Sequence, residues 1–279
     1  MCGLVGIQFL THRRSAEVWS ELKKFFLQCF IFHQERGREA SGVAVIKKSG
    51  SFLILKKPVP AEELVKTKSF ELLMDTLDDD TALVLAHTRA PTKGDPQNYY
   101  NNHPLIIGQV IGIHNGELKN DDELFEWFGF PRRAEVDSEI IFWLLNSLGS
   151  ISEKSLRFSL NQANQLFSFL NGSFTVMAVN INQPRFLWVI KKDRPLCHHF
   201  HREWGVRVFA SRYLFLRRAF GRQVLAEALE SEHIYLFDRE VLGSQPLLSS
   251  PLKISSRGSS NGKMPILSGA GSTRRGAVS

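Results

Sequence analysis

The sequence predicts an α+β fold in which two stacked β-sheets are covered by helices. Short apolar segments typical of buried strands fall into two groups, one before residue 116 and one between residues 173 and 238. A helical region separates the two groups, and amphipathic helices accompany the first. Sheets and helices must bury their apolar faces against each other, and two layers of sheet between helices do so.

In the first half of the chain, helix and strand signals alternate. Apolar side chains from Trp19 to Cys29 recur at helical spacing beside a charged face. The Ser49-Gly50 pair between two apolar segments is typical of a hairpin. The elements expected here are a strand at 2–10, a helix at 16–34, hairpin strands at 41–48 and 52–57, a helix at 61–77, and strands at 82–87 and 106–114.

The second half begins with helices and continues mainly with strands. Helices are expected at 120–128, 137–148 and 152–170. The strands and one short helix expected after them are 174–180, 185–191, 206–210, the helix 213–220, and 233–237. No internal repeat interrupts this order.

Length and charge divide the chain into a body and a tail. A chain of 279 residues with 43% hydrophobic residues can bury the core of one large domain, expected over 1–248. Residues 249–279 are rich in Ser and Gly, lack aromatic residues and are predicted to be a disordered basic tail. Five of the 35 Lys and Arg lie after residue 250, so the net charge of +7 leaves the body nearly neutral. A basic tail without aromatic residues is a weak signal for nucleic acid, which is not an expected partner.

The sequence predicts a cytoplasmic protein without a membrane partner. Its three cysteines, Cys2, Cys29 and Cys197, are too few and too scattered for a disulfide framework. The N-terminus lacks the features of a secretory signal, and no apolar run is long enough to span a bilayer.

The second residue of the chain is a cysteine. Removal of Met1 would give Cys2 a free α-amine next to its thiol, and the pKa values of the two groups are about 7.7–8.0 and about 8.5. Such a residue combines a nucleophile with its own base. The alternative is that Cys2 is a small apolar residue at the start of a strand.

Two polar loops follow expected helices or strands. Arg36–Gly42 contains two glycines that permit a close approach of the backbone to a ligand, although a turn after a helix explains them equally well. His87–Gly94 follows an apolar strand. Its Arg89 is suited to bidentate binding of a carboxylate.

Two further segments place polar groups at the ends of elements. Asn115 and Gly116 combine a side-chain amide with a backbone N–H and so suit an oxyanion, but Asn-Gly is also a common turn. Asp137 is expected as the N-cap of a helix, where its carboxylate would also suit an ammonium group.

Together these segments resemble the class II, N-terminal-nucleophile glutamine amidotransferases. The resemblance is greatest to the glutaminase domain of glucosamine-6-phosphate synthase and its relatives, and it covers about residues 2–240. The matching motifs are, in the order of the family, Cys2–Gly6, Arg36–Gly42, Ala86–Arg89, Asn101–Pro104, His114–Gly116 and Val136–Glu139. The resemblance implies a four-layer αββα sandwich of two mostly antiparallel sheets.

The resemblance also implies a role for each matching residue. Cys2 would be the nucleophile, with its α-amine as the general base, and Asn115 and Gly116 would form the oxyanion hole. Arg89 would bind the α-carboxylate of glutamine, and Asp137 its α-ammonium. The two remaining residues would be Arg36, which organises the nucleophile end, and Thr92, whose backbone lines the substrate.

The chain departs from the family in two places. Ala90 stands where synthase members have tryptophan and Lys93 where they have histidine, so the loop after Arg89 should cover the substrate less completely. In addition, family members usually continue into a domain that consumes the ammonia. A separate protein is therefore the expected ammonia acceptor.

Cys197-His198-His199-Phe200-His201 is a possible metal cluster. The alternative is a strand of the second sheet, in which alternation sends His198 to one face and Cys197, His199 and His201 to the other. We expect the strand, and neither a metal nor an organic cofactor.

The predicted function is that of a glutamine amidotransferase that releases ammonia from the glutamine side chain through a Cys2 thioester. One alternative is a free-standing hydrolase of another γ-glutamyl amide, because Arg89 and Asp137 recognise only the amino-acid head. The other is a non-catalytic regulatory subunit with the same fold.

Overall fold

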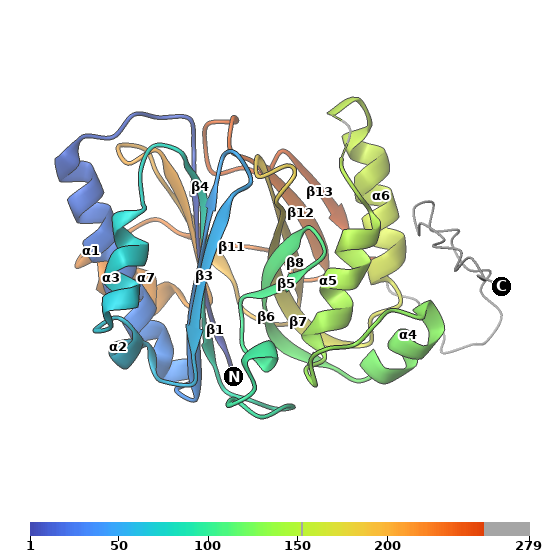
Figure 1. Ribbon diagram of the computed structural model, residues 1–279. Coiled ribbons are helices and arrows are strands. Elements are labelled where there is room, and N and C mark those ends of the chain that lie inside the picture. Colours follow the sequence, from blue (N-terminus) through green and yellow to red (C-terminus); the bar gives the residue numbers. More distant parts are fainter. Residues whose placement is uncertain (152, 254–279) are drawn as a thin grey trace, which may run out of the picture.

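The computed structural model describes residues 1–151 and 153–253. They form four layers, in which two antiparallel sheets lie face to face between two groups of helices (Figure 1). This confirms the predicted αββα sandwich. Chain segments far apart in the sequence meet in both sheets.

The first sheet has seven strands in the order β11-β9-β10-β1-β4-β2-β3. Its strand bounds are β1 Gly3–Phe9, β2 Ala40–Lys47, β3 Phe52–Lys57, β4 Thr81–Arg89, β9 Cys197–His201, β10 Val206–Ala210 and β11 Glu227–Ala228. β1 is a central strand, paired with β4 on one side and β10 on the other. All residues of β1 are buried, as expected for an apolar strand covered on both faces.

Four helices cover the outer face of this sheet (Figure 1). They are α1 Ala16–His33, α2 Ala61–Leu64, α3 Lys68–Asp75 and α7 Tyr213–Phe220. The hydroxyl of Ser15 caps α1 by accepting the N–H of Val18, and the apolar face of α1 packs on the strands through residues such as Leu22 and Phe26. A 3-10 turn, η1 Gln34–Arg36, leads from α1 toward β2.

The second sheet has six strands in the order β13-β12-β8-β7-β6-β5. The bounds are β5 Leu105–Ile107, β6 Val110–Leu118, β7 Gly172–Asn180, β8 Phe186–Lys192, β12 His233–Asp238 and β13 Leu248–Pro251. The helices on its outer face are α4 Asp121–Phe128, α5 Ser138–Ser147 and α6 Leu156–Phe167 (Figure 1). Two more 3-10 turns are η2 Tyr99–Asn101 and η3 Glu153–Ser155.

The facing sides of the sheets share a buried apolar core. Leu4 of β1 and Leu85 of β4 pack there with Ile113 of β6 and Val189 of β8. This core fixes the ends of β1 and β4 relative to β6, where the candidate site lies.

Two predicted elements are divided in the structure. The helix expected over 61–77 is two helices, because the Thr67 hydroxyl caps a new helix by accepting the N–H of Phe70. The strand expected over 106–114 is a hairpin of β5 and β6 that turns at Gly108 and Gln109.

The sheet assignment of residues 197–201 was wrong. These residues form a strand, but β9 pairs with β10 in the same sheet as β1, and not in the second sheet. The predicted alternation holds: His198 packs against Phe209 and Phe237 between the sheets, whereas Cys197 packs on the helix side. No group of His, Cys, Asp and Glu suited to a metal ion occurs in residues 1–151 and 153–253.

The expected boundary at residue 248 falls on the first residue of β13, which pairs with β12 through Pro251. The N–H of Lys253 donates to Asn164 Oδ1 at 2.7 Å, so the folded body includes residues 249–253. The remainder of the expected tail, 254–279, lies outside the described residues. Within the described part of the chain, no helix has both the length and the apolar character needed to cross a membrane.

Candidate active site

The candidate site lies where the start of β1 and the end of β4 meet β6 of the facing sheet. Gly3 is paired with Thr88 of β4, which places Cys2 beside Arg89 and Ala90. The side chain of Asn115 on β6 reaches across to β1, where its Oδ1 accepts the N–H of Cys2 at 3.0 Å. One hydrogen bond therefore joins the two sheets at the nucleophile candidate.

Gly3 allows this tight packing. A Cβ atom at this position would lie 2.5 Å from Thr88 Oγ1 and 2.8 Å from the carbonyl oxygen of His33. Any larger residue would push the start of β1 away from β4. Gly3 thus keeps Cys2 close to Arg89.

The thiol of Cys2 is half-buried and points toward Ala90, whose carbonyl oxygen is 3.6 Å from Sγ. Burial, and to a lesser degree the Asp137 carboxylate, raises the pKa of the thiol. The positive charges of the terminal ammonium and of Arg89 act in the opposite direction. A base close to Cys2 is therefore needed to make a thiolate near neutral pH.

The side-chain nitrogen of Asn115, Nδ2, is an unused donor group. The residue is 1% exposed, its Oδ1 is held by Cys2, and its Nδ2 is buried without a hydrogen-bond partner among the described residues. Leaving a buried amide N–H unpaired costs about 1–3 kcal/mol. Such a donor, oriented by its own oxygen beside a thiol, is suited to an oxyanion.

The register of β6 places the N–H of Gly116 at an open edge. The hydrogen bonds from Ile181 N to Gln109 O and from Lys119 N to Asn171 O show that odd-numbered residues of β6 bond to β7. Even-numbered residues therefore face the other side, where β5 pairs only as far as Gly112. The N–H of Gly116 lies on this unpaired edge.

Gly116 has a backbone that few other residues tolerate. Its φ is +152°, and an added Cβ would lie 2.2 Å from the carbonyl oxygen of Ser173. The backbone of β6 therefore requires a glycine directly after Asn115. The Asn-Gly pair lies within the strand and does not form the tight turn that this dipeptide often forms.

Arg89 is 3% exposed and binds the loop that follows it. Its Nη2 donates to the carbonyl oxygens of Lys93 at 2.7 Å and Gly94 at 2.8 Å, and its Nη1 donates to Asn102 Oδ1 at 2.7 Å. These bonds use three of its five N–H donors. The remaining donors, the Nε–H and one N–H of Nη1, make no hydrogen bond to another described residue and are available singly to a ligand.

Asp137 is at the N-cap position of α5, but its side chain does not cap the helix, contrary to the sequence prediction. Its Oδ2 instead accepts the N–H of Leu118 at 2.6 Å, on the same open edge of β6 as Gly116. Its Oδ1 lies 3.4 Å from the hydroxyl of Ser138. Asp137 is 6% exposed and within electrostatic range of Cys2.

The other two predicted residues differ in their placement. Arg36, at the end of η1, donates from Nε to the carbonyl oxygen of Cys2 at 2.7 Å and so holds the start of β1. Thr92 is exposed in the loop after β4, and no hydrogen bond joins its side chain to another described residue.

Comparisons with known proteins find relatives of this chain among enzymes. The glutamine–fructose-6-phosphate aminotransferase of Sulfurisphaera tokodaii is 32% identical over 206 residues, which are 70% of this chain and 31% of that protein. The 7-cyano-7-deazaguanine synthase 2 of the same organism is 25% identical over 218 residues, which are 76% of this chain and 43% of the relative. No family model matches the chain.

The chain is homologous to the class II glutamine amidotransferases. A solved glutamine phosphoribosylpyrophosphate amidotransferase from B. subtilis has the same fold, with a TM-score of 0.63 and 19% identity. The superposition covers 91% of this chain and 50% of that structure. The chain thus spans half or less of the length of these relatives.

Sequence reasoning missed two features of this amidotransferase homologue. Asn102 holds Arg89 and is itself held by Lys56, whose Nζ donates to the Asn102 carbonyl oxygen at 2.7 Å. The signal for Asn102 was its place in the Asn101–Pro104 motif, to which no role had been given. Lys56 had no signal in the sequence.

The second missed feature is an ionic contact of the loop after Arg89. The Nζ of Lys93 lies 2.7 Å from Asp121 Oδ2 and 3.2 Å from Asp122 Oδ1, at the start of α4. Arg132 contacts the same two carboxylates. The departure from the family at Lys93 therefore ties the loop to α4 in this amidotransferase homologue.

Proposed function

We propose that this chain catalyses the glutaminase half of an amidotransferase reaction, with Cys2 as the nucleophile. The observation that carries the proposal is the buried, unpartnered Nδ2 of Asn115 beside Cys2. A donor of this kind has no structural use in the described part of the chain. It suits the negative charge that develops when a thiol attacks a carboxamide.

The first step requires the removal of Met1, because Cys2 N is an amide nitrogen while Met1 is attached. The free α-amine would then take the proton of the Cys2 thiol, and the sulfur would attack the side-chain carbonyl carbon of glutamine. Asn115 Nδ2 and the Gly116 N–H would bind the resulting oxyanion.

The second step releases ammonia. The α-ammonium returns its proton to the leaving nitrogen, the carbon–nitrogen bond breaks, and a γ-glutamyl thioester remains on Cys2. The α-amine then takes a proton from water, which attacks the thioester. Glutamate leaves and the thiol is restored.

Substrate binding is assigned to the groups around this centre. An unused N–H donor of Arg89 would bind the α-carboxylate of glutamine, and the Asp137 carboxylate would bind its α-ammonium. The backbone around Thr92 would line the substrate, and Arg36 would hold the start of β1. Binding of the α-carboxylate and the α-ammonium in this way would place the side-chain carboxamide of glutamine at Cys2.

We further propose that a separate protein accepts the ammonia and that the reaction takes place in a reducing cytoplasm. Support for the partner comes from the relatives, which are longer than the matched region, and one of which is by its name an aminotransferase that acts on fructose-6-phosphate. Support for the compartment is that all three cysteines are free, as a Cys2 nucleophile requires.

The test combines intact-mass measurement of the N-terminus with a coupled assay for ammonia release. A trimmed chain that releases ammonia from glutamine, and a Cys2→Ala variant that does not, would support the proposal. A trimmed chain that hydrolyses other γ-glutamyl amides but not glutamine would favour the hydrolase alternative. A trimmed, folded chain that is inactive alone and with proteins recovered from its host would favour the regulatory subunit.

A further inference from the structure

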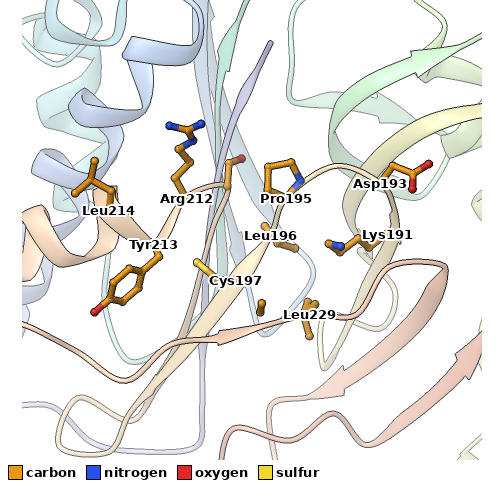
Figure 2. A pocket seen from close by; sticks show the side chains of 11 residues that line it. Lys191, Asp193, Pro195, Leu196, Cys197, Arg212, Tyr213, Leu214 and Leu229 are labelled. Carbon is orange, nitrogen blue, oxygen red and sulfur yellow. The ribbon is translucent and has the colours of Figure 1, made fainter.

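A pocket of about 600 Å³ lies beside the candidate active site and is used by no step above. Figure 2 shows its side chains, with Arg212 and Tyr213 on one side, Lys191 and Asp193 on the other, and apolar residues between them. Leu196 and Leu229 are among the apolar lining residues. The volume is within the range of small-molecule sites, about 300–1,000 Å³.

The pocket borders the strand that carries Cys2. Ser211 lines it and is bonded to β1 twice: its N–H donates to the Leu4 carbonyl oxygen at 3.0 Å, and its Oγ accepts the Leu4 N–H at 2.8 Å. Continuing the pairing of Val5 with Ala210 places Arg212 opposite Gly3, one residue from Cys2. A ligand in the pocket would therefore lie next to the nucleophile end of β1.

Arg212 lines the pocket, and two further arginines, Arg36 and Arg194, lie outside its lining near Met1, at the same end of β1. Arg36 Nη2 and Arg194 Nη1 both approach the sulfur of Met1, at 3.8 Å and 3.6 Å. Burial lowers the pKa of Arg36, and the positive charges of Arg212 and Arg194 lower it further, so the three guanidinium groups lie within electrostatic range. In residues 1–151 and 153–253, no carboxylate lies within 4.0 Å of any of them.

The groups that now contact these cations are uncharged. Arg36 Nε donates to the Cys2 carbonyl oxygen at 2.7 Å and Arg194 Nε to the Ser173 carbonyl oxygen at 3.4 Å, while their terminal nitrogens approach only a thioether sulfur. A thioether sulfur is a poor acceptor for a guanidinium, and Arg212 makes no hydrogen bond through its side chain to the described residues. Lys191 is the second cation in the lining of the pocket, and its charged neighbour Asp193 partly balances it. Several unbalanced cations close together favour a dianionic group, and arginine is especially suited to phosphate.

We propose that this pocket binds a small organic phosphate, with the phosphate at Arg212, Arg194 and Arg36 and the apolar part against Leu196 and Leu229. This ligand is additional to glutamine, which the proposed function places on the other side of Cys2, at Arg89. Its binding needs no turnover, so it can be tested separately from the chemistry of Cys2.

The test is calorimetric titration of the full chain with phenyl phosphate, which has a dianionic group and an apolar ring. Benzyl alcohol serves as the neutral control and inorganic phosphate as the control without an apolar part. We expect saturable binding of phenyl phosphate that weakens as salt is added, weaker binding of inorganic phosphate, and none of benzyl alcohol. The Cys2→Ala chain should bind phenyl phosphate as the unchanged chain does.

Two variants locate the site. Arg212→Ala should weaken binding by about 10-fold or more, because it removes a charge-assisted contact. Ala228→Trp should also abolish binding, because Ala228 is an exposed residue of the lining and a large side chain would fill the pocket. The matched control is Arg202→Ala, which removes the same charge from an exposed turn elsewhere.

Thermal unfolding should show that all variants remain folded. The proposal is overturned if phenyl phosphate does not bind saturably below about 10 mM, because the dissociation constant of a specific site is expected to lie below this concentration. It is equally overturned if Arg212→Ala binds as tightly as Arg202→Ala, or if the filled pocket of Ala228→Trp still binds.

Discussion

The side chain of Asn102 anchors Arg89, because its Oδ1 accepts an N–H of Nη1 at 2.7 Å. Both residues are buried, and two backbone carbonyl oxygens of the following loop hold the other end of the guanidinium. Arg89 is therefore fixed before any substrate arrives. Pre-organisation of this kind reduces the entropy lost on binding.

Arg89→Lys tests whether this guanidinium binds glutamine. Lysine keeps the charge but loses the planar fork, so KM should rise by a factor that corresponds to about 1–3 kcal/mol. Asn102→Ala should also raise KM, because it keeps the Arg89 residue but removes the bond that fixes its guanidinium. Steady-state kinetics with glutamine measures both effects, and an unchanged KM in both variants would show that the carboxylate binds elsewhere.

Cys2→Ala should abolish ammonia release with little effect on folding, because no other thiol lies in the site. Cys197→Ala is the matched control, since it removes a buried thiol from β9 and should retain activity. A glutamine-analogue electrophile such as diazo-oxo-norleucine should add once. Mass spectrometry that located the label on Cys29 or Cys197 would contradict the assignment.

Asn115→Ala should lower kcat by about 10²–10³, the usual cost of one oxyanion donor. KM should change much less, because Nδ2 contacts the carbonyl oxygen only when it becomes negatively charged. The variant also loses the bond from Cys2 N to Oδ1, so thermal unfolding must be measured alongside. A kcat within about three-fold of the parent would be incompatible with the proposed oxyanion hole.

Lys93→Met should loosen the loop after Arg89 without destabilising the protein. Lys93 is exposed, and Arg132 continues to pair with the buried Asp121 and with Asp122 when Lys93 is replaced, so little stability should be lost. The expected result is a higher KM for glutamine with little change in the unfolding temperature. Lys68→Met, which breaks an exposed pair with Glu71 on α3, is the control and should change neither quantity.

Buried histidines should make the protein sensitive to acid. Burial lowers the pKa of His87 to about 3, that of His33 to about 4, and that of His103 well below its ordinary value. In the unfolded chain they bind protons near pH 6.5. Each therefore stabilises the fold above about pH 6.5, and this contribution is lost as the pH falls toward the folded pKa.

Denaturant unfolding at a series of pH values measures this loss, expected at up to about 1.4 kcal/mol per pH unit for each histidine. His103→Phe should reduce the slope, because His103 packs beside His87 and Phe142 without a hydrogen bond to either ring nitrogen. The exposed His12, changed to Gln, is the control. An equal slope in the parent and in His103→Phe would mean that His103 is protonated in the folded state.

Sequence patterns identified the elements whose signals are local. The apolar runs of β1 and β4 and the motifs at Cys2, Arg89 and Asn115 needed no knowledge of distant contacts. The direction of the Asp137 side chain, by contrast, depends on a backbone N–H of β6, a separate element. The position of β9 depends on its pairing with β10, and strand periodicity alone does not reveal which sheet a strand joins.

β1 is the first strand to leave the ribosome, yet its pairing in the sheet is completed late, because one of its two partners is β10. Val5 pairs with Ala210, so the strand that carries Cys2 can complete its pairing only after a segment about two hundred residues later in the chain has been synthesised. During most of synthesis the N-terminus should accordingly remain accessible to the aminopeptidase that the proposed removal of Met1 requires. Chains shortened before β10 should have neither a closed sheet nor an active centre.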